Sequence, residues 1–230
     1  MPRGQRIEFT TDDGIRIVGN WTTAPTTVGA AILLHMMPSN KESWDGMQQQ
    51  LAHRGIASLA IDLRGHGEST QTVEGAAIDY RAFTDAEHAE SIQDAIGAHA
   101  WIRARGIEDD RIGTIGASVG ANLSLQLLQQ NPTMPCAVLL SPGLDYRGVD
   151  AMNAAKYVTP EQSVFIVASA EDDDESVEAS EQIMDALEIE TKLFKRLKRV
   201  GHGTAMIEGD AVLAGEIADW VRDRIQNFEL

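Results

Sequence analysis

Apolar residues follow two alternating patterns along the chain. Short continuous apolar runs, typical of strands buried on both faces of a sheet, stand at 29–35, 56–62, 136–141 and 163–169. Between such runs, segments including 40–55 and 118–131 place their apolar residues at helical spacing. The alternation of strand and helix predicts a parallel sheet covered by helices on both faces.

The two ends of the chain add further elements. Two segments of alternating polar and apolar residues flank Asp13-Gly14 and predict an antiparallel hairpin at the start. Strands are also predicted at 111–116 and 191–198. A final helix from Asp210 carries an apolar stripe.

A helix is also predicted to begin at Thr84. Thr84 and Glu87 form the T-x-x-E pattern of a capping box. The helix that they start is predicted to end near Gly106. No repeat or linker interrupts the chain, so we expect one α/β domain over residues 1–230.

Composition narrows the possible partners. The 230 residues include 35 acidic and 19 basic side chains, which gives a formal charge of −16. Such a surface repels nucleic-acid phosphates and anionic membranes, so neither is expected as a partner. No apolar stretch approaches the ~18 residues of a membrane span. No apolar segment follows the charged start MPRGQRIEF, so no signal peptide is expected, and the expected location is cytoplasmic.

The single cysteine, Cys136, excludes an intrachain disulfide. It lies in an apolar run, so we expect a buried small side chain. No group of His, Cys and carboxylate residues has the spacing of metal ligands, and neither a metal nor another cofactor is expected.

A serine stands between two glycines where a strand is predicted to end and a helix to begin. These residues are Gly116, Ser118 and Gly120 in the sequence GASVG. In that setting G-x-S-x-G is a nucleophile elbow, a sharp turn that presents the serine hydroxyl above the sheet. Ser118 is therefore the candidate nucleophile.

A serine nucleophile needs a base and an orienting acid, which should follow it in the chain. His202 is the one histidine after Ser118, in a glycine-flanked loop between the last strand and the last helix. The acid should follow the strand at 163–169. Asp172, Asp173 and Asp174 all stand there, and the residues alone leave the choice open.

Together these segments resemble the α/β-hydrolase superfamily over nearly the whole chain. The resemblance rests on LLHMMP (33–38), IDLRGHGES (61–69), GASVG (116–120), the acids after the strand and GHG (201–203). It implies an α/β-hydrolase fold with a mostly parallel central sheet, an N-terminal antiparallel hairpin and helices on both faces. The family's acid register implies Asp173. Its oxyanion hole implies the N–H groups of Met37 and Val119, with Met36 where relatives often carry glycine.

The resemblance also implies an open site. Only residues 142–162 connect the strand at 136–141 to the acid strand, which leaves no room for a large lid domain. We expect a substrate pocket lined by Met36, Leu144 and Tyr146, together with Met37. This outline is similar to dienelactone-hydrolase-like proteins and small carboxylesterases, although dienelactone hydrolases carry cysteine at the elbow.

The expected function is that of a serine hydrolase for small carboxylic esters or thioesters, acting through an acyl-enzyme intermediate. The expected partner is thus a small-molecule ester substrate. A peptidase or amidase of the same fold is one alternative. A non-catalytic scaffold that binds a ligand or a partner is another. The oligomeric state and the natural substrate stay open.

Overall fold

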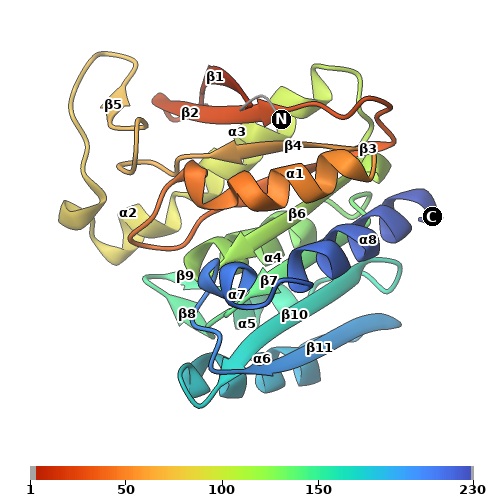
Figure 1. Ribbon diagram of the computed structural model, residues 1–230. Coiled ribbons are helices and arrows are strands. Elements are labelled where there is room, and N and C mark those ends of the chain that lie inside the picture. Colours follow the sequence, from red (N-terminus) through yellow and green to blue (C-terminus); the bar gives the residue numbers. More distant parts are fainter. Residues whose placement is uncertain (1–3, 229–230) are drawn as a thin grey trace.

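A run of parallel strands forms the centre of a mixed, 9-stranded sheet (Figure 1). The computed structural model describes residues 4–228, so the first three residues of the charged amino-terminal stretch lie outside it. The parallel strands are β4 (Ile56–Ile61), β3 (Gly29–Leu34), β6 (Ile112–Ala117), β7 (Cys136–Leu140), β10 (Ser163–Ala170) and β11 (Thr191–Lys198). They are adjacent in that order, and β11 is the last strand of the sheet.

The predicted N-terminal hairpin is confirmed. It consists of β1 (Gln5–Thr10) and β2 (Ile15–Thr22), which pair antiparallel to each other. β2 also pairs antiparallel with β4 and with the short β5 (Gln71–Thr72). The hairpin therefore extends the sheet on the side of β4.

Helices cover both faces of the sheet (Figure 1). One face carries α1 (Asp45–His53), α7 (Ala205–Gly209) and α8 (Leu213–Gln226). The other carries α3 (Ile92–Arg103), α4 (Val119–Gln130), α5 (Ala151–Ala155) and α6 (Asp174–Ala186). Shorter elements are α2 (Asp85–Ala89), the hairpin of β8 (Asp145–Tyr146) and β9 (Val149–Asp150), and 3₁₀ turns at Lys41–Trp44, Tyr80–Ala82 and Asp109–Arg111.

The continuous apolar runs arise because both faces of each central strand are buried. In β3, Ile32 packs into the layer of α3 and α4, while its neighbour Leu33 packs into the layer of α1 and α8. Successive strand residues point to opposite faces, so a strand covered on both sides needs no polar position. The prediction of a mostly parallel sheet between two helical layers is confirmed.

The prediction of one continuous helix from Thr84 to near Gly106 is wrong, because this segment forms two helices, α2 and α3. The capping box is present: Glu87 N–H donates to Thr84 Oγ1, and the Glu87 carboxylate accepts the Thr84 N–H at 2.7 Å. Around Ser91 the backbone makes i→i+3 hydrogen bonds, including Ser91 N to His88 O at 3.0 Å. Such bonds tighten the chain into a 3₁₀-like turn that interrupts the helix.

The motif IDLRGHGES forms a rigid loop after β4. The buried Asp62 accepts hydrogen bonds from Lys41 N, Lys41 Nζ and Glu68 N, each at 2.8 Å. A Cβ on Gly67 would stand 2.3 Å from the Asp62 carboxyl carbon, so only glycine fits there. Lys41 comes from the loop after β3, so Asp62 joins the two loops.

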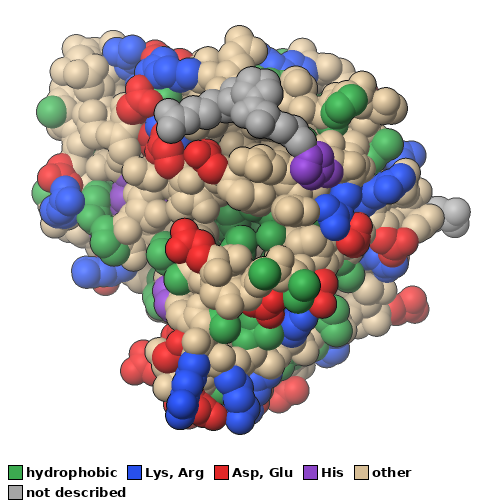
Figure 2. All heavy atoms as spheres, viewed as in Figure 1, with side chains coloured by type: hydrophobic (Ala, Val, Ile, Leu, Met, Phe, Trp, Pro, Cys, Tyr) green, Lys and Arg blue, Asp and Glu red, His purple; other side chains and the backbone are tan. Residues whose placement is uncertain are grey.

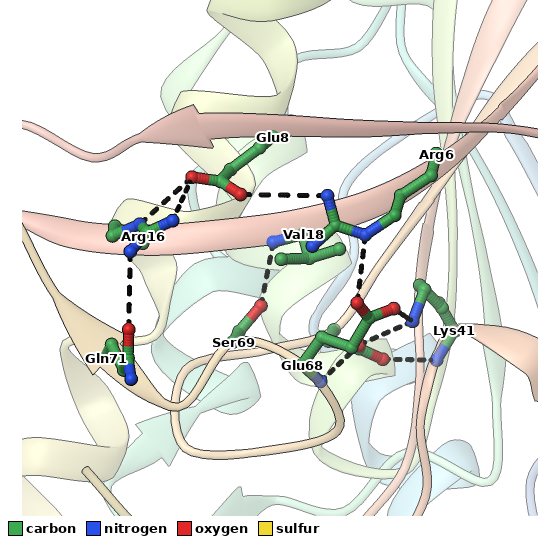
Figure 3. A network of polar contacts seen from close by, with 9 residues as sticks. Arg6, Glu8, Arg16, Val18, Lys41, Glu68, Ser69 and Gln71 are labelled. Carbon is green, nitrogen blue, oxygen red and sulfur yellow. Dashed lines mark hydrogen bonds and ion pairs between the residues drawn. The ribbon is translucent and has the colours of Figure 1, made fainter. Parts of the chain in front are cut away.

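Figure 3 shows how the loops after β3 and β4 are hydrogen-bonded to the β1–β2 hairpin. Lys41 Nζ also donates to Glu68 at 2.9 Å, and Glu68 accepts a hydrogen bond from Arg6 of β1. Ser69 Oγ accepts the Val18 N–H of β2 at 2.9 Å. These contacts fix the loop after β3, which carries the predicted oxyanion-hole residue.

The connection from β7 to β10 is short, as predicted. It contains the β8–β9 hairpin and α5, and no large lid domain. Cys136 is fully buried, and burial raises the pKa of its thiol to about 12. Within residues 4–228, no helix combines the length and the apolar character needed to cross a bilayer. Acidic and basic side chains lie interspersed on the face shown in Figure 2.

Candidate active site

The predicted site residues lie at one edge of the sheet. The parallel strands β3, β6, β10 and β11 all end at that edge, and residue positions 37, 118, 173 and 202 follow them in turn. In open α/β sheets the carboxyl ends of the strands are where ligands bind.

Ser118 occupies a sharp turn between β6 and α4. Its φ of 53° and ψ of −120° lie in a region that side-chain-bearing residues rarely adopt. Its N–H donates to Leu140 O at 2.8 Å, which fastens the turn to β7. Because α4 begins at Val119, the hydroxyl lies at a helix N-terminus, where N–H groups and the helix dipole favour negative charge.

The flanking glycines are required by close packing. A Cβ on Gly116 would stand 1.9 Å from Gly120 O, and one on Gly120 would stand 2.2 Å from Leu34 O. Both distances are far below van der Waals contact. The tight approach brings α4 against the end of β3 and therefore against the loop that carries Met37.

Asp173 and His202 are in direct contact. His202 Nδ1 lies 2.8 Å from Asp173 Oδ2, and Ser176 Oγ donates to Asp173 Oδ1 at 2.8 Å. Burial opposes the charge on Asp173, but hydrogen bonds from His202, Ser141 and Ser176 outweigh it and hold the pKa of the carboxyl below its usual value. Asp173 is therefore a stable anion, and it fixes the proton of a neutral His202 on Nδ1, which leaves Nε2 as the basic atom.

The two neighbouring acids have other partners. Asp172 accepts hydrogen bonds from Ser169 Oγ at 2.6 Å and from Gly201 N at 2.7 Å. Asp174 accepts the Glu171 N–H at 3.0 Å at the start of α6. Of the three acids that the sequence left open, Asp173 is the one whose carboxylate contacts the imidazole.

The predicted oxyanion donors have free N–H groups. Neither Met37 N nor Val119 N has an acceptor among residues 4–228. The loop before Met37 is held by the buried His35, whose Nε2 accepts the Leu63 N–H and whose Nδ1 donates to Met36 O. Burial lowers the pKa of His35 to about 4, so this histidine is neutral and structural.

The predicted pocket residues divide between two places. Met36 lies against the His202 loop: its sulfur is 4.0 Å from Thr204 Oγ1 and would be 2.6 Å from a Cβ on Gly203. Leu144 and Tyr146 pack on the other layer, where Leu144 directly precedes β8 and Tyr146 lies in it. Met36 thus contacts the loop that carries His202, and Tyr146 lies beside Ser141 and Ser176.

The Tyr146 hydroxyl lies near Ser176 and Ser141. It is 3.4 Å from Ser176 Oγ and 3.5 Å from Ser141 O. Burial raises the pKa of this phenol, against the opposing effect of hydrogen bonds with Ser176 and Ser118. The structure does not join Ser118 to His202 by a hydrogen bond; the contact it does make within the predicted triad is that of Asp173 with His202.

One cavity lies beside the sheet edge where the strands end, and a larger cavity lies away from it. A cleft of about 330 Å³ adjoins the loop after β3 and is lined in part by Pro38, Ser39, His66 and Tyr80. A larger cavity of about 880 Å³ lies around Gly55, at the opposite ends of the parallel strands, and is remote from Ser118. Within the described part of the chain, no three His, Cys or carboxylate side chains converge as metal ligands would.

Ser141 and Ser176 both interact with Asp173, and neither could be recognised from the sequence. Ser141 Oγ accepts the Gly203 N–H at 3.0 Å, and Ser141 helps to hold the pKa of Asp173 below its usual value. Ser141 also has a φ of 50° directly after β7. Its position after a strand neighbouring the acid strand was the available signal, but a lone serine there has no distinctive spacing.

Several solved structures share the fold. An esterase from Pyrococcus furiosus is 18% identical, with a TM-score of 0.76, covering 98% of this chain and 92% of that one. Dienelactone hydrolase from Anabaena variabilis is 16% identical, with a TM-score of 0.72 and full coverage of both chains. The α/β hydrolase GrgF from Penicillium sp. is 16% identical, with a TM-score of 0.80, covering 98% of this chain and 100% of that one.

The sequence itself gives the family. No curated protein matches it significantly. The family model for the alpha/beta hydrolase fold matches residues 31–174, more than half of the chain and a region that includes the elbow and the acid. The chain belongs to the α/β-hydrolase superfamily.

Proposed function

We propose that the protein is a serine hydrolase that cleaves small carboxylic esters or thioesters. The observation that carries the proposal is the Asp173–His202 contact of 2.8 Å, at the sheet edge where Ser118 is held at a strained turn. An anionic acid, a histidine with its Nδ1 proton fixed and a serine at a helix N-terminus supply the three roles of a nucleophilic triad.

In acylation, Ser118 Oγ attacks the substrate carbonyl while His202 Nε2 takes the hydroxyl proton. Asp173 stabilises the imidazolium that forms. The free N–H groups of Met37 and Val119 donate to the oxyanion of the tetrahedral intermediate. Collapse of the intermediate releases the alcohol or thiol, which takes its proton from His202.

Deacylation repeats these steps with water as the nucleophile. His202 accepts a proton from water, the hydroxide forms a second tetrahedral intermediate, and the acid product leaves as Ser118 regains its proton. The Ser118–His202 hydrogen bond is assigned to the substrate complex, since catalytic hydrogen bonds often tighten only there.

Small ester substrates are favoured by the surroundings of Ser118. Only the β8–β9 hairpin and α5 lie between β7 and β10, so the site lacks a large lid domain. Leu144 and Tyr146 offer limited apolar surface for an acyl group. Two of the solved structures that share the fold are named as an esterase and a dienelactone hydrolase, which supports an ester substrate here.

The direct test is reaction with a fluorophosphonate probe, followed by mapping of the modified residue by mass spectrometry. The expected result is covalent modification of Ser118 alone. A panel of p-nitrophenyl esters with acyl chains of graded length should then give turnover that is highest for short chains.

The remaining outcomes separate the alternatives. No modification of Ser118 together with no ester turnover would indicate a scaffold that binds without catalysis. Modification of Ser118 with turnover of amides, but not of esters, would indicate a peptidase or amidase. Either result would overturn the proposal.

A further inference from the structure

The loop that carries His202 is held by side chains from two strand ends. The N–H groups of Val200, Gly201 and Gly203, which surround His202, all donate to side-chain oxygens. Their acceptors are Ser169 Oγ, Asp172 Oδ2 and Ser141 Oγ, at 3.0, 2.7 and 3.0 Å. Backbone in a glycine-containing loop would otherwise bond to water and move with it.

Asp172 is central to this arrangement because it uses both carboxylate oxygens. Oδ2 accepts the Gly201 N–H, one residue before His202, and Oδ1 accepts the Ser169 hydroxyl at 2.6 Å. Ser169 Oγ in turn accepts the Val200 N–H. The carboxylate therefore joins the end of β10 to the loop after β11 through charge-assisted bonds, which are the stronger class.

We infer that Asp172 is a positioning residue for His202. The two adjacent carboxylates have different partners: Asp173 contacts the imidazole ring, and Asp172 accepts a hydrogen bond from the backbone next to His202. The inference rests on the proposed function only for its effect on turnover. The geometric part stands on the hydrogen bonds of Asp172.

The expected effect follows from the demands of proton transfer. His202 must keep its Nδ1 on Asp173 and its Nε2 within reach of Ser118. His202 is partly exposed, with 38% of its side chain accessible, so packing alone does not fix the ring. A displacement of about 1 Å in a catalytic group can lower the rate about 100-fold.

The test compares Asp172→Ala and Asp172→Asn with Asp174→Ala as the matched control. Asp174 is also exposed and bonds a backbone N–H, but that N–H belongs to Glu171 and not to the His202 loop. In Asp172→Ala, kcat should fall roughly 10- to 100-fold with little change in KM. Asp172→Asn should fall less, because its amide oxygen can still accept the Gly201 N–H.

A second readout does not depend on turnover. The proton shared by His202 Nδ1 and Asp173 should give a downfield proton NMR signal in the wild type and in Asp174→Ala. It should weaken or shift in both Asp172 variants at a temperature where circular dichroism shows them folded. Asp172→Asn keeps the side-chain size and supplies this measurement if Asp172→Ala does not fold.

The possible outcomes test the positioning role of Asp172 and the proposed function separately. Wild-type kcat and an unchanged NMR signal in the Asp172 variants would overturn the positioning role, whatever the reaction. An equal loss of kcat in Asp174→Ala would overturn it too, because the effect would then be one of charge. Failure of Ser118 to react with the probe, beside an NMR signal that responds to Asp172, would overturn the proposed function and leave the positioning role supported.

Discussion

The α-carbon of Gly120 lies so close to the carbonyl oxygen of Leu34 that a Cβ would stand 2.2 Å from it. This approach sets the first turn of α4 against the end of β3. It therefore sets the spacing between Ser118 and the Met37 loop. The turn at Ser118 and the positions of the predicted oxyanion donors therefore depend on the absence of a side chain at Gly120.

Gly120→Ala should consequently destabilise the protein by about 2 kcal/mol or more, because the methyl group must displace backbone. The matched control is Gly46→Ala, also in a helix, where a Cβ meets no atom within 4 Å. That change should be neutral or stabilise by up to about 1 kcal/mol, since alanine favours helix. Urea unfolding of both variants checks the prediction, and equal effects would contradict it.

Ser118→Ala should abolish ester turnover and leave the fold intact. The change removes one oxygen from a position where a small residue already fits. The loss should be roughly 10³-fold or more, because triad members act as a unit. Ser163→Ala, at the buried start of β10 and remote from the site, serves as the control. A Ser118→Ala protein with a tenth of wild-type activity would rule out the elbow as the nucleophile.

Asp173→Asn should lower kcat by several orders of magnitude. The neutral amide cannot stabilise an imidazolium, and its NH2 group can donate to Nδ1, which favours the wrong imidazole tautomer. Asp174→Asn should change kcat less than about tenfold, because a charge exposed to water acts weakly on its surroundings. Steady-state kinetics at saturating ester compares the two. Near-normal kcat in Asp173→Asn would show that His202 works without this acid.

Folding stability should fall in mild acid because of two buried histidines. Burial lowers the pKa of His35 to about 4 from an ordinary value of 6.5, and burial with the nearby His35 does the same for His66. As the pH falls below about 6.5 the unfolded chain takes up these protons and the folded protein does not. Stability is therefore full above that pH and is lost progressively down to about pH 4, by roughly 3 kcal/mol for each histidine at most.

Urea midpoints measured from about pH 7.5 to about pH 4.5 test this dependence. His66→Gln should flatten the slope between these values, whatever it does to stability at neutral pH. His53→Gln, which replaces an exposed histidine, controls for the substitution itself. An unchanged slope in His66→Gln would contradict the assignment.

Local chemistry explains which parts of the fold could be predicted from the sequence. The buried strands were predictable because each lies between two helical layers and is therefore mostly apolar at successive positions, as Ile32 and Leu33 show. The Thr84–Glu87 capping box was predictable because its partners are three residues apart. The break between α2 and α3 was not, because apolar spacing is similar in a helix and in a helix with one 3₁₀-like turn.

In the candidate site, too, some residues could be predicted from the sequence and some contacts could not. The sequence order and the elbow pattern indicated Ser118 and His202, and the family register indicated Asp173. The partner of Asp172 is the backbone of Gly201, 29 residues away, and a backbone group leaves no trace in residue identity. The identities of the acids therefore do not reveal that Asp172 contacts the loop after β11.

The position of β11 at the end of the sheet has a consequence for how the candidate site responds to heating. β11 pairs with β10 on one side and has no strand on the other among residues 4–228, and most of its side chains are exposed or half-buried. Such a strand can separate locally while the interior of the sheet stays paired. His202 lies in the loop after β11, whereas Ser118 follows an interior strand. We therefore expect heating to displace His202 while Ser118 is still in place, so that ester turnover would stop when one outer strand separates and before the core melts.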